Sequence, residues 1–281
     1  MWKLIIAEQS KVLRWKMLWI GVGLVSALVV LALAAMNASN PPQDILERQV
    51  IWPMVLVVVL RQFAANCTLT GLLLVAMVGG VVAQEYGWRT LHLVLGRGVG
   101  RLTLLGAKMG AMLVPTALVV GVPFLAGGAF SGWLTYQHTG LLPFARVHWL
   151  QLLWSVALAI YGLLPYVALA LLCAVAGRSP VTAICTGVGI VLAENALWPL
   201  LRGLGSMGLQ IARWFPMGLS MSMLHASEGI PAIPLSGAAA VDVWANLQLL
   251  EPGVAALATA AYLVVFLGVA GVVFVRQDLS G

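Results

Sequence analysis

Long apolar runs, each nearly free of charged residues, are the feature of this sequence that most limits its fold. Only 9% of the residues are charged and 62% are hydrophobic, and the mean hydropathy is +1.01. Soluble domains carry about 25% charged residues. A helix needs roughly 20 apolar residues to cross the hydrocarbon core of a bilayer. We therefore predict an all-α integral membrane protein with a single transmembrane domain over residues 1–281.

Six runs are long enough to cross the lipid bilayer. The predicted spans cover about 17–36, 62–83, 109–130, 150–172, 181–201 and 253–275. Residues 51–60 are also apolar but contain Pro53 and end before Arg61, so we expect a re-entrant or interfacial piece at the outer surface. Residues 202–252 are rich in Gly, Pro, Ser and Met and predict a partly helical external segment on that surface.

Residues 1–16 have the pattern of an amphipathic helix. Trp2 and Ile5 fall on one side of a helical wheel, and Lys3 and Lys11 fall on the other. This pattern is typical of a helix that lies in the membrane interface. A signal peptide is the alternative, but its apolar region would be only about 7–15 residues long. We expect the segment to be retained as an interfacial helix before the first span.

The basic residues are distributed unequally between the two sides of the predicted membrane domain. Ten lie on the side of the N-terminus and five on the other. The ten are Lys3, Lys11, Arg14, Lys16, Arg89, Arg97, Arg101, Lys108, Arg178 and Arg276, and the five are Arg48, Arg61, Arg146, Arg202 and Arg213. By the positive-inside rule, both termini are predicted to face the cytoplasm. The net charge of +6 is explained by this placement and does not indicate nucleic-acid binding.

Residues 84–108 form a basic loop between two predicted spans. Trp88, Leu91 and Leu95 share one face of a short predicted helix. Gly96, Gly98 and Gly100 follow, and alternate glycines favour a turn. The pattern fits two interpretations equally well: a basic loop held at the lipid headgroups, or a contact for a soluble partner.

The same segment carries a family resemblance. The string E-Y-x-W-x-T-L-x-x-x-L-x-R-G-V-x-R-x-x-x-L-x-x-K, from Glu85 to Lys108, resembles the first cytoplasmic loop of ABC-2 type permeases, the membrane subunits of ATP-binding-cassette exporters. It departs from that pattern at Arg89, where a small residue is expected. The resemblance implies a cytoplasmic coupling helix that contacts an ATPase. The residues it assigns to ATPase coupling are Glu85, Trp88, Arg89, Thr90, Leu91, Leu95, Arg97 and Arg101.

The resemblance also implies partners. Such permeases pair with a second copy or a paralogue, and two cytoplasmic ABC ATPase subunits power them. The expected location is the cytoplasmic membrane of a bacterium, with the chain crossing the bilayer several times. The implied function is an ATP-driven exporter that works by alternating access at a dimer interface.

We expect this chain to catalyse no reaction by itself. The sequence lacks a GxxxxGK[ST] motif, because the stretch from Gly100 to Lys108 has the wrong spacing. We therefore expect no catalytic residue and no cofactor here, with ATP and Mg²⁺ bound by the partner subunit. Cys67, Cys173 and Cys185 lie in apolar runs and predict buried packing thiols with no disulfide and no metal site.

Glu194 is the only acidic residue inside a predicted span. A charge in hydrocarbon costs about 2.5–3.5 kcal/mol on insertion scales, so the side chain should find a partner or water. Arg61 and Asn195 are the nearest polar candidates, and the three residues form a candidate outer gate. Two other function classes remain open: an ion- or proton-coupled secondary transporter that uses Glu194, and a membrane scaffold subunit.

Overall fold

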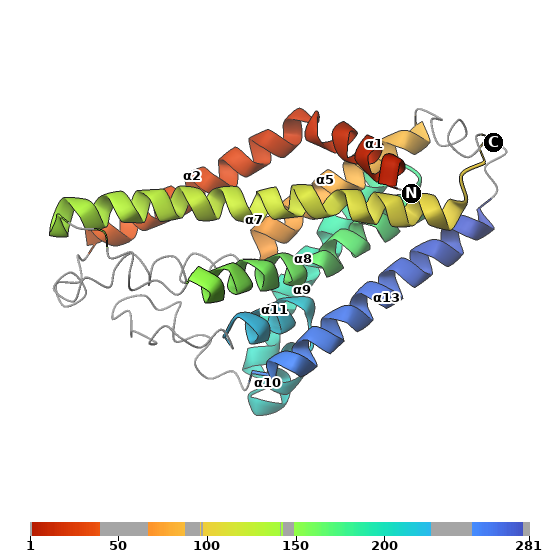
Figure 1. The fold of residues 1–281 in the computed structure, drawn as a ribbon. Helices are drawn as coiled ribbons and strands as arrows, with labels where there is room; N and C mark the ends of the chain where they lie inside the picture. The colour runs from red at the N-terminus through yellow and green to blue at the C-terminus, as the bar shows by residue number, and fades with distance from the viewer. Residues whose placement is uncertain are drawn as a thin grey trace.

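The computed structural model describes residues 2–39, 67–87, 96, 98–140, 142, 149–225 and 249–277, and the regular structure in these ranges is helical (Figure 1). This confirms the predicted all-α class. The helices are α1 (Trp2–Leu13), α2 (Lys16–Ser39), α5 (Cys67–Gly87), α7 (Arg101–Thr139), α8 (Trp149–Gly177), α9 (Pro180–Gly203), α10 (Ser206–Ala212), α11 (Pro216–His225) and α13 (Pro252–Arg276).

Five helices among the described residues are long and apolar enough to cross a membrane: α2, α7, α8, α9 and α13. The apolar part of α5 is shorter and runs from Thr70 to Tyr86. Each of the six predicted spans overlaps one of these helices, while the number of crossings stays a prediction. The predicted piece at 51–60 lies outside the described residues.

The helices form a bundle in which α8 packs against α5, α7, α9, α11 and α13, and α5 packs against α8 and α9. Leu74 and Val75 of α5 are fully buried in the main apolar core. Helix α2 packs along α7, and α13 packs against α8. The start of α1, the end of α5, the start of α7, the α8–α9 turn and the end of α13 all lie at one end of the molecule (Figure 1).

Small residues allow α5 and α9 to approach closely. A Cβ on Gly187 of α9 would collide with the side chain of Val75, and a Cβ on Gly79 of α5 would touch the backbone of Ala183. Gly80, also on α5, faces the Trp15 ring and the Ile184 side chain. The small residues of α5 are therefore used for packing inside this chain.

Helix α7 is longer than the span predicted at 109–130. It begins at Arg101, continues through Pro115 and Pro123, and ends at Thr139. Gly140 caps it with a φ of 69°, in the left-handed region that favours glycine. The predicted loop at 84–108 is correspondingly shorter. Its charged ends had suggested a loop, but the described part of the chain pairs several of these charges inside the protein, as shown below.

The described part of the segment after α9 packs into the bundle, and its predicted external location stays a prediction. It is partly helical, as expected, with the short helices α10 and α11. Helix α11, however, is buried: Leu219 and Met223 are fully enclosed, and α11 packs against α8 and α13. Its ten residues are too few for a membrane crossing and alternate Ser with Met, so hydropathy gave no signal of burial.

Short breaks in the chain separate two pairs of consecutive helices. The chain breaks at Arg14–Trp15, so α1 is a helix distinct from α2, and Figure 1 shows the two meeting at an angle. The turn after α8 places Arg178 at a φ of 50°, and Pro180 begins α9, where its missing N–H and fixed φ suit the first turn.

Candidate functional site

The predicted coupling segment lies between α5 and α7 in the chain. Glu85 lies in the last turn of α5, and Arg101 is the first residue of α7. The other residues assigned to coupling lie outside the described residues: Trp88, Arg89, Thr90, Leu91, Leu95 and Arg97. Gly98 has a φ of 81° within a turn, which confirms the predicted glycine break before α7.

A buried charge network joins the ends of α5 and α7 to α1. Lys108 Nζ of α7 lies 2.6 Å from Glu85 Oε2 of α5 and 3.0 Å from Glu8 Oε2 of α1. Lys11 Nζ lies 2.7 Å from Glu8 Oε1 and 3.5 Å from Glu85 Oε1. Each carboxylate thus contacts both ammonium groups, so the two acids and two bases balance in charge.

Burial makes this network different from a surface ion pair. Glu8 and Lys108 are each only 3% exposed and Glu85 is 7% exposed, whereas about half of the Lys11 side chain meets solvent. Burial alone would raise the pKa of Glu8, but the charge of Lys108 and the hydrogen bonds from Lys11 and Lys108 lower it. Burial alone would lower the pKa of Lys11, but Glu8 and Glu85 raise it.

Arg101 holds the end of the last helix. Its Nη1 donates to the backbone oxygens of Phe274, Val275 and Gln277 at 3.1, 2.7 and 2.8 Å. These carbonyls belong to the C-terminal end of α13, which has no further turn to bond them and carries partial negative charge. The Gln277 side chain also donates to the oxygen of Val175 in α8 over 2.7 Å. Arg101 and Gln277 therefore fasten α7, α8 and α13 together.

The second predicted site centres on Glu194, which is 8% exposed on α9. Its Oε2 accepts a hydrogen bond from the Tyr166 hydroxyl at 2.9 Å, and its Oε1 accepts one from the Met217 N–H at 3.0 Å. The Asn195 amide donates to the Val191 oxygen of its own helix at 2.8 Å. Arg61 lies outside the described residues, so the proposed pair of Glu194 with Arg61 stays a prediction.

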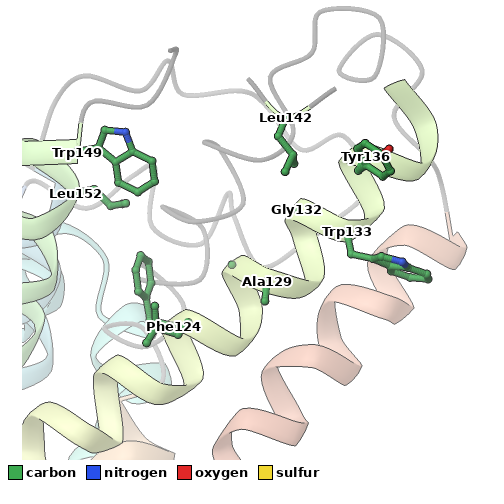
Figure 2. Close-up of a pocket in the computed structure, with 10 residues that line it drawn as sticks. Phe124, Ala129, Gly132, Trp133, Tyr136, Leu142, Trp149 and Leu152 are labelled. Carbon is green, nitrogen blue, oxygen red and sulfur yellow. The ribbon is translucent and has the colours of Figure 1, made fainter. Parts of the chain in front are cut away.

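An apolar pocket lies between α7 and α8, toward the end of the molecule opposite the charge network. Its volume is about 520 Å³. Figure 2 shows Phe124, Trp133 and Tyr136 of α7 together with Trp149 and Leu152 of α8 among the residues that line it. Within the described ranges, no group of three or more His, Cys, Asp or Glu side chains comes together that could hold a metal ion.

Sequence reasoning missed three of these polar partners. Glu8 and Lys108 carry opposite charges and lie far apart in the chain. Tyr166 carries a hydroxyl group within a predicted span. A search for polar groups flanked by apolar residues would have selected Lys108 and Tyr166, whereas Glu8 is followed by the polar residues 9–11 and carries no such signal. The thiol prediction held for Cys173, which is buried, and was wrong for Cys185, which is exposed on α9. The side chain of Cys67 lies outside the described part.

A helical bundle with several membrane-length helices and a charged end defines a multi-pass membrane protein. The sequence profile described as ABC-2 family transporter protein matches residues 4–193, from α1 into α9. The match covers more than half of the chain, which therefore belongs to the ABC-2 transporter family. No curated protein matches it. The chain is thus a permease subunit of an ABC transporter, is not itself catalytic, and belongs to a family that associates with ABC ATPase subunits.

Proposed function

We propose that this chain is the membrane subunit of an ATP-driven exporter, and that cytoplasmic ABC ATPase subunits bind its segment 88–100. The observation that carries the proposal is the attachment of this segment. It follows α5, which carries Glu85 in its last turn, and precedes α7, which begins at Arg101, and both residues are bonded to other helices. A soluble subunit that moved the segment would therefore act on the bundle through firmly attached ends.

The charges at this end of the molecule support a cytoplasmic location. Lys3, Lys11, Arg14, Lys16, Arg101, Lys108, Arg178 and Arg276 all belong to helix ends or turns on this side. Basic residues are retained on the cytoplasmic side of membrane proteins. Single cysteines introduced at Arg178 and Glu228, in a background without the native thiols, test the orientation. Impermeant reagent should label position 228 and spare position 178 in sealed cells, and equal labelling would contradict this orientation.

The outward face of α9 supports pairing with a second copy or a paralogue. Thr182, Thr186, Gly189 and Ala193 are exposed and follow one another at spacings of four and three residues. Such small and hydroxyl-bearing residues allow membrane helices to approach closely. Two subunits joined along α9 would create a shared interface, at which we propose alternating access of the substrate.

The apolar pocket favours an amphipathic or lipid-like substrate. Its volume of about 520 Å³ lies within the roughly 300–1,000 Å³ typical of small-molecule sites. Trp133, Tyr136 and Trp149 are about half exposed beside it, and such aromatic residues are common at membrane–water interfaces. A small hydrated ion would instead need a polar path.

Transport coupled to ions or protons through Glu194 has less support. The carboxyl group contacts the Tyr166 hydroxyl and the Met217 N–H, and these contacts give it a structural role in joining helices. A scaffold without transport activity would not need an attached segment for an ATPase. The exporter proposal accounts for both the family membership and the attachment of the segment.

Reconstitution tests the proposal. The chain is co-expressed with an ABC ATPase partner, purified, and analysed by native mass spectrometry for a complex of two permease and two ATPase subunits. Proteoliposomes then report ATP-dependent movement of a fluorescent phospholipid. ATP-dependent movement that is lost when the ATPase Walker A lysine is replaced is the expected result. Uptake driven by a proton gradient without any ATPase would contradict it.

A further inference from the structure

Lys108 closes the base of the segment that we assign to ATPase binding. Glu85 precedes the segment and Lys108 follows it, 23 positions later in the chain, yet their charged groups lie 2.6 Å apart. The helices that flank the segment, α5 and α7, are therefore joined by an ion pair. Lys108 is 3% exposed, so water does not screen this contact as it would at a surface.

The same ammonium group also reaches α1. Lys108 Nζ donates to Glu8 Oε2 at 3.0 Å, and Lys11 bridges Glu8 and Glu85 from the other side. Two acids and two bases thus form a closed set of contacts. Withdrawing one base would leave two buried carboxylates facing a single cation, an arrangement that is strongly unfavourable. The three helices that carry these side chains should consequently move together at this end, because separating them would break the ion pairs.

Packing extends the link from α1 to α2. A Cβ on Gly110 of α7 would touch Ile5 of α1 at 3.4 Å, so the two helices lie close together beside the network. Val12, near the end of α1, is buried, and Trp15 at the junction with α2 lies against Gly80 of α5. A displacement of α1 would therefore reach α2, which packs along α7.

We propose that Lys108 is a positioning residue that transmits movement of the 88–100 segment to α1 and α2 through its ion pairs with Glu85 and Glu8. This inference rests on the proposed function. It adds a route by which ATP binding at one end would rearrange the membrane helices. The contacts themselves are present without any ATPase, so part of the proposal can be tested on the chain alone.

The experiment compares Lys108→Met, Lys108→Arg and the double variant Lys108→Met/Glu85→Gln. The double variant removes one charge of each sign and leaves Glu8 paired with Lys11. If the network only balances charge, the double variant should recover both folding and transport. If it transmits movement, the double variant should fold and retain the ATPase subunit, yet lose coupling. Lys3→Met removes an exposed charge on α1, outside the network, and is the control.

Transport per ATP hydrolysed is the main readout. We expect transport per ATP hydrolysed to fall at least about fivefold in the double variant, which is the lower end of typical coupling strengths. Lys108→Arg should retain coupling because it keeps the charge, and Lys3→Met should behave as wild type. Wild-type transport per ATP in a folded double variant would overturn the proposal.

A second readout does not depend on the ATPase. Spin labels on the exposed residues Ala7 of α1 and Leu102 of α7 report the separation of these helices. We expect one narrow distance distribution in the wild type and a broadened one in the double variant. An unchanged distribution in the double variant would overturn the ionic link. If the wild-type chain did not bind an ATPase, that result would contradict the proposed function. The distance measurement would still test the ionic link, because it needs no ATPase.

Discussion

Tyr166 on α8 donates a hydrogen bond to Glu194 on α9 over 2.9 Å, and the same carboxyl group accepts the Met217 N–H at the start of α11 over 3.0 Å. One side chain therefore joins three helices. The first N–H groups of a helix have no partner within it, so an acceptor from another element stabilises its start. This relationship explains how α11 is held in the bundle.

Replacement of Glu194 by Ala should loosen α11. The Met217 N–H would lose its partner, and an unsatisfied buried group costs about 1–3 kcal/mol. Hydrogen–deuterium exchange should rise in peptides that cover 216–225. Ile190→Ala, at an exposed position of α9, is the control and should leave that exchange unchanged.

Tyr166→Phe separates packing from hydrogen bonding. The ring carbons lie against Gly71 and would stay in place, while the hydroxyl contact with Glu194 would be lost. Additive effects of Tyr166→Phe and Glu194→Ala on exchange would contradict the pairing, because coupled residues give non-additive effects.

Replacement of Gly187 by Val should disrupt the α5–α9 contact. Val75 already occupies the space that a Cβ at this position needs, and overpacking costs about 1–3 kcal/mol. The melting temperature of the purified subunit in detergent should fall. Gly189→Val is the matched control on the same helix, since a Cβ there meets no atom within 4 Å. An equal loss in both variants would show that helix propensity, and not packing, sets the effect.

Replacement of Arg101 by Ala should release the end of α13. Three carbonyl oxygens would lose their common donor. A cation near a helix C-terminus typically stabilises the helix by about 0.3–1 kcal/mol, and by up to about 2 kcal/mol when partly buried. Exchange should rise in peptides covering 270–277. Arg276→Ala removes a neighbouring exposed charge and should have little effect. Protection that stays at the wild-type level in Arg101→Ala would contradict the assigned contacts.

The stability contributed by Glu8 should depend on pH in a defined direction. Lys108 and Lys11 outweigh burial and lower its pKa below the ordinary value of 4.5. A lowered folded-state pKa means that the ionised form is stabilised. This contribution is complete above the ordinary pKa and is lost as the pH falls through the folded-state pKa.

Glu8→Gln tests this dependence. We expect it to destabilise the subunit by about 1–3 kcal/mol at pH 7, the range for a buried polar group that loses its partner. Thermal unfolding measured from pH 7 down to about pH 3 should show the wild type and variant converging at the acidic end. A constant difference across this range would mean that the effect of the substitution is not ionic.

The sequence predicted the apolar helices well because length and hydropathy alone determine them. It did not predict that α7 begins at Arg101, since a charge inside a helix looks like a loop until its partner is known. Lys108 finds Glu8 100 positions away, and that pairing depends on how α1 folds back on α7. The burial of α11 likewise depends on Glu194 and on the surfaces of α8 and α13. Periodicity carries no information about such contacts.

The same distinction applies to the coupling segment. Its position between α5 and α7 and its glycine turn were readable from the sequence. The partners of Glu85 and Arg101 could not be read in the same way. Glu85 pairs with Lys108 of α7, and Arg101 bonds to the end of α13, so both partners are distant in the sequence. Both residues were predicted to contact the ATPase, and the contacts within the chain now favour a role in holding the segment. Their part in coupling, and that of Arg89 and Arg97, stays a prediction.

Binding of the ATPase by the apolar face of the segment is the central claim, and retention of that subunit during purification tests it most directly. Trp88→Ala and Leu91→Ala should each weaken binding by about 2 kcal/mol or more, roughly thirtyfold, because buried anchors dominate interface energies. Arg97→Ala should cost less, since rim charges mainly set orientation and rate. With each variant confirmed to be folded, loss of the ATPase subunit from Trp88→Ala and Leu91→Ala is the predicted result. Wild-type retention and wild-type ATP hydrolysis in both variants would contradict the claim.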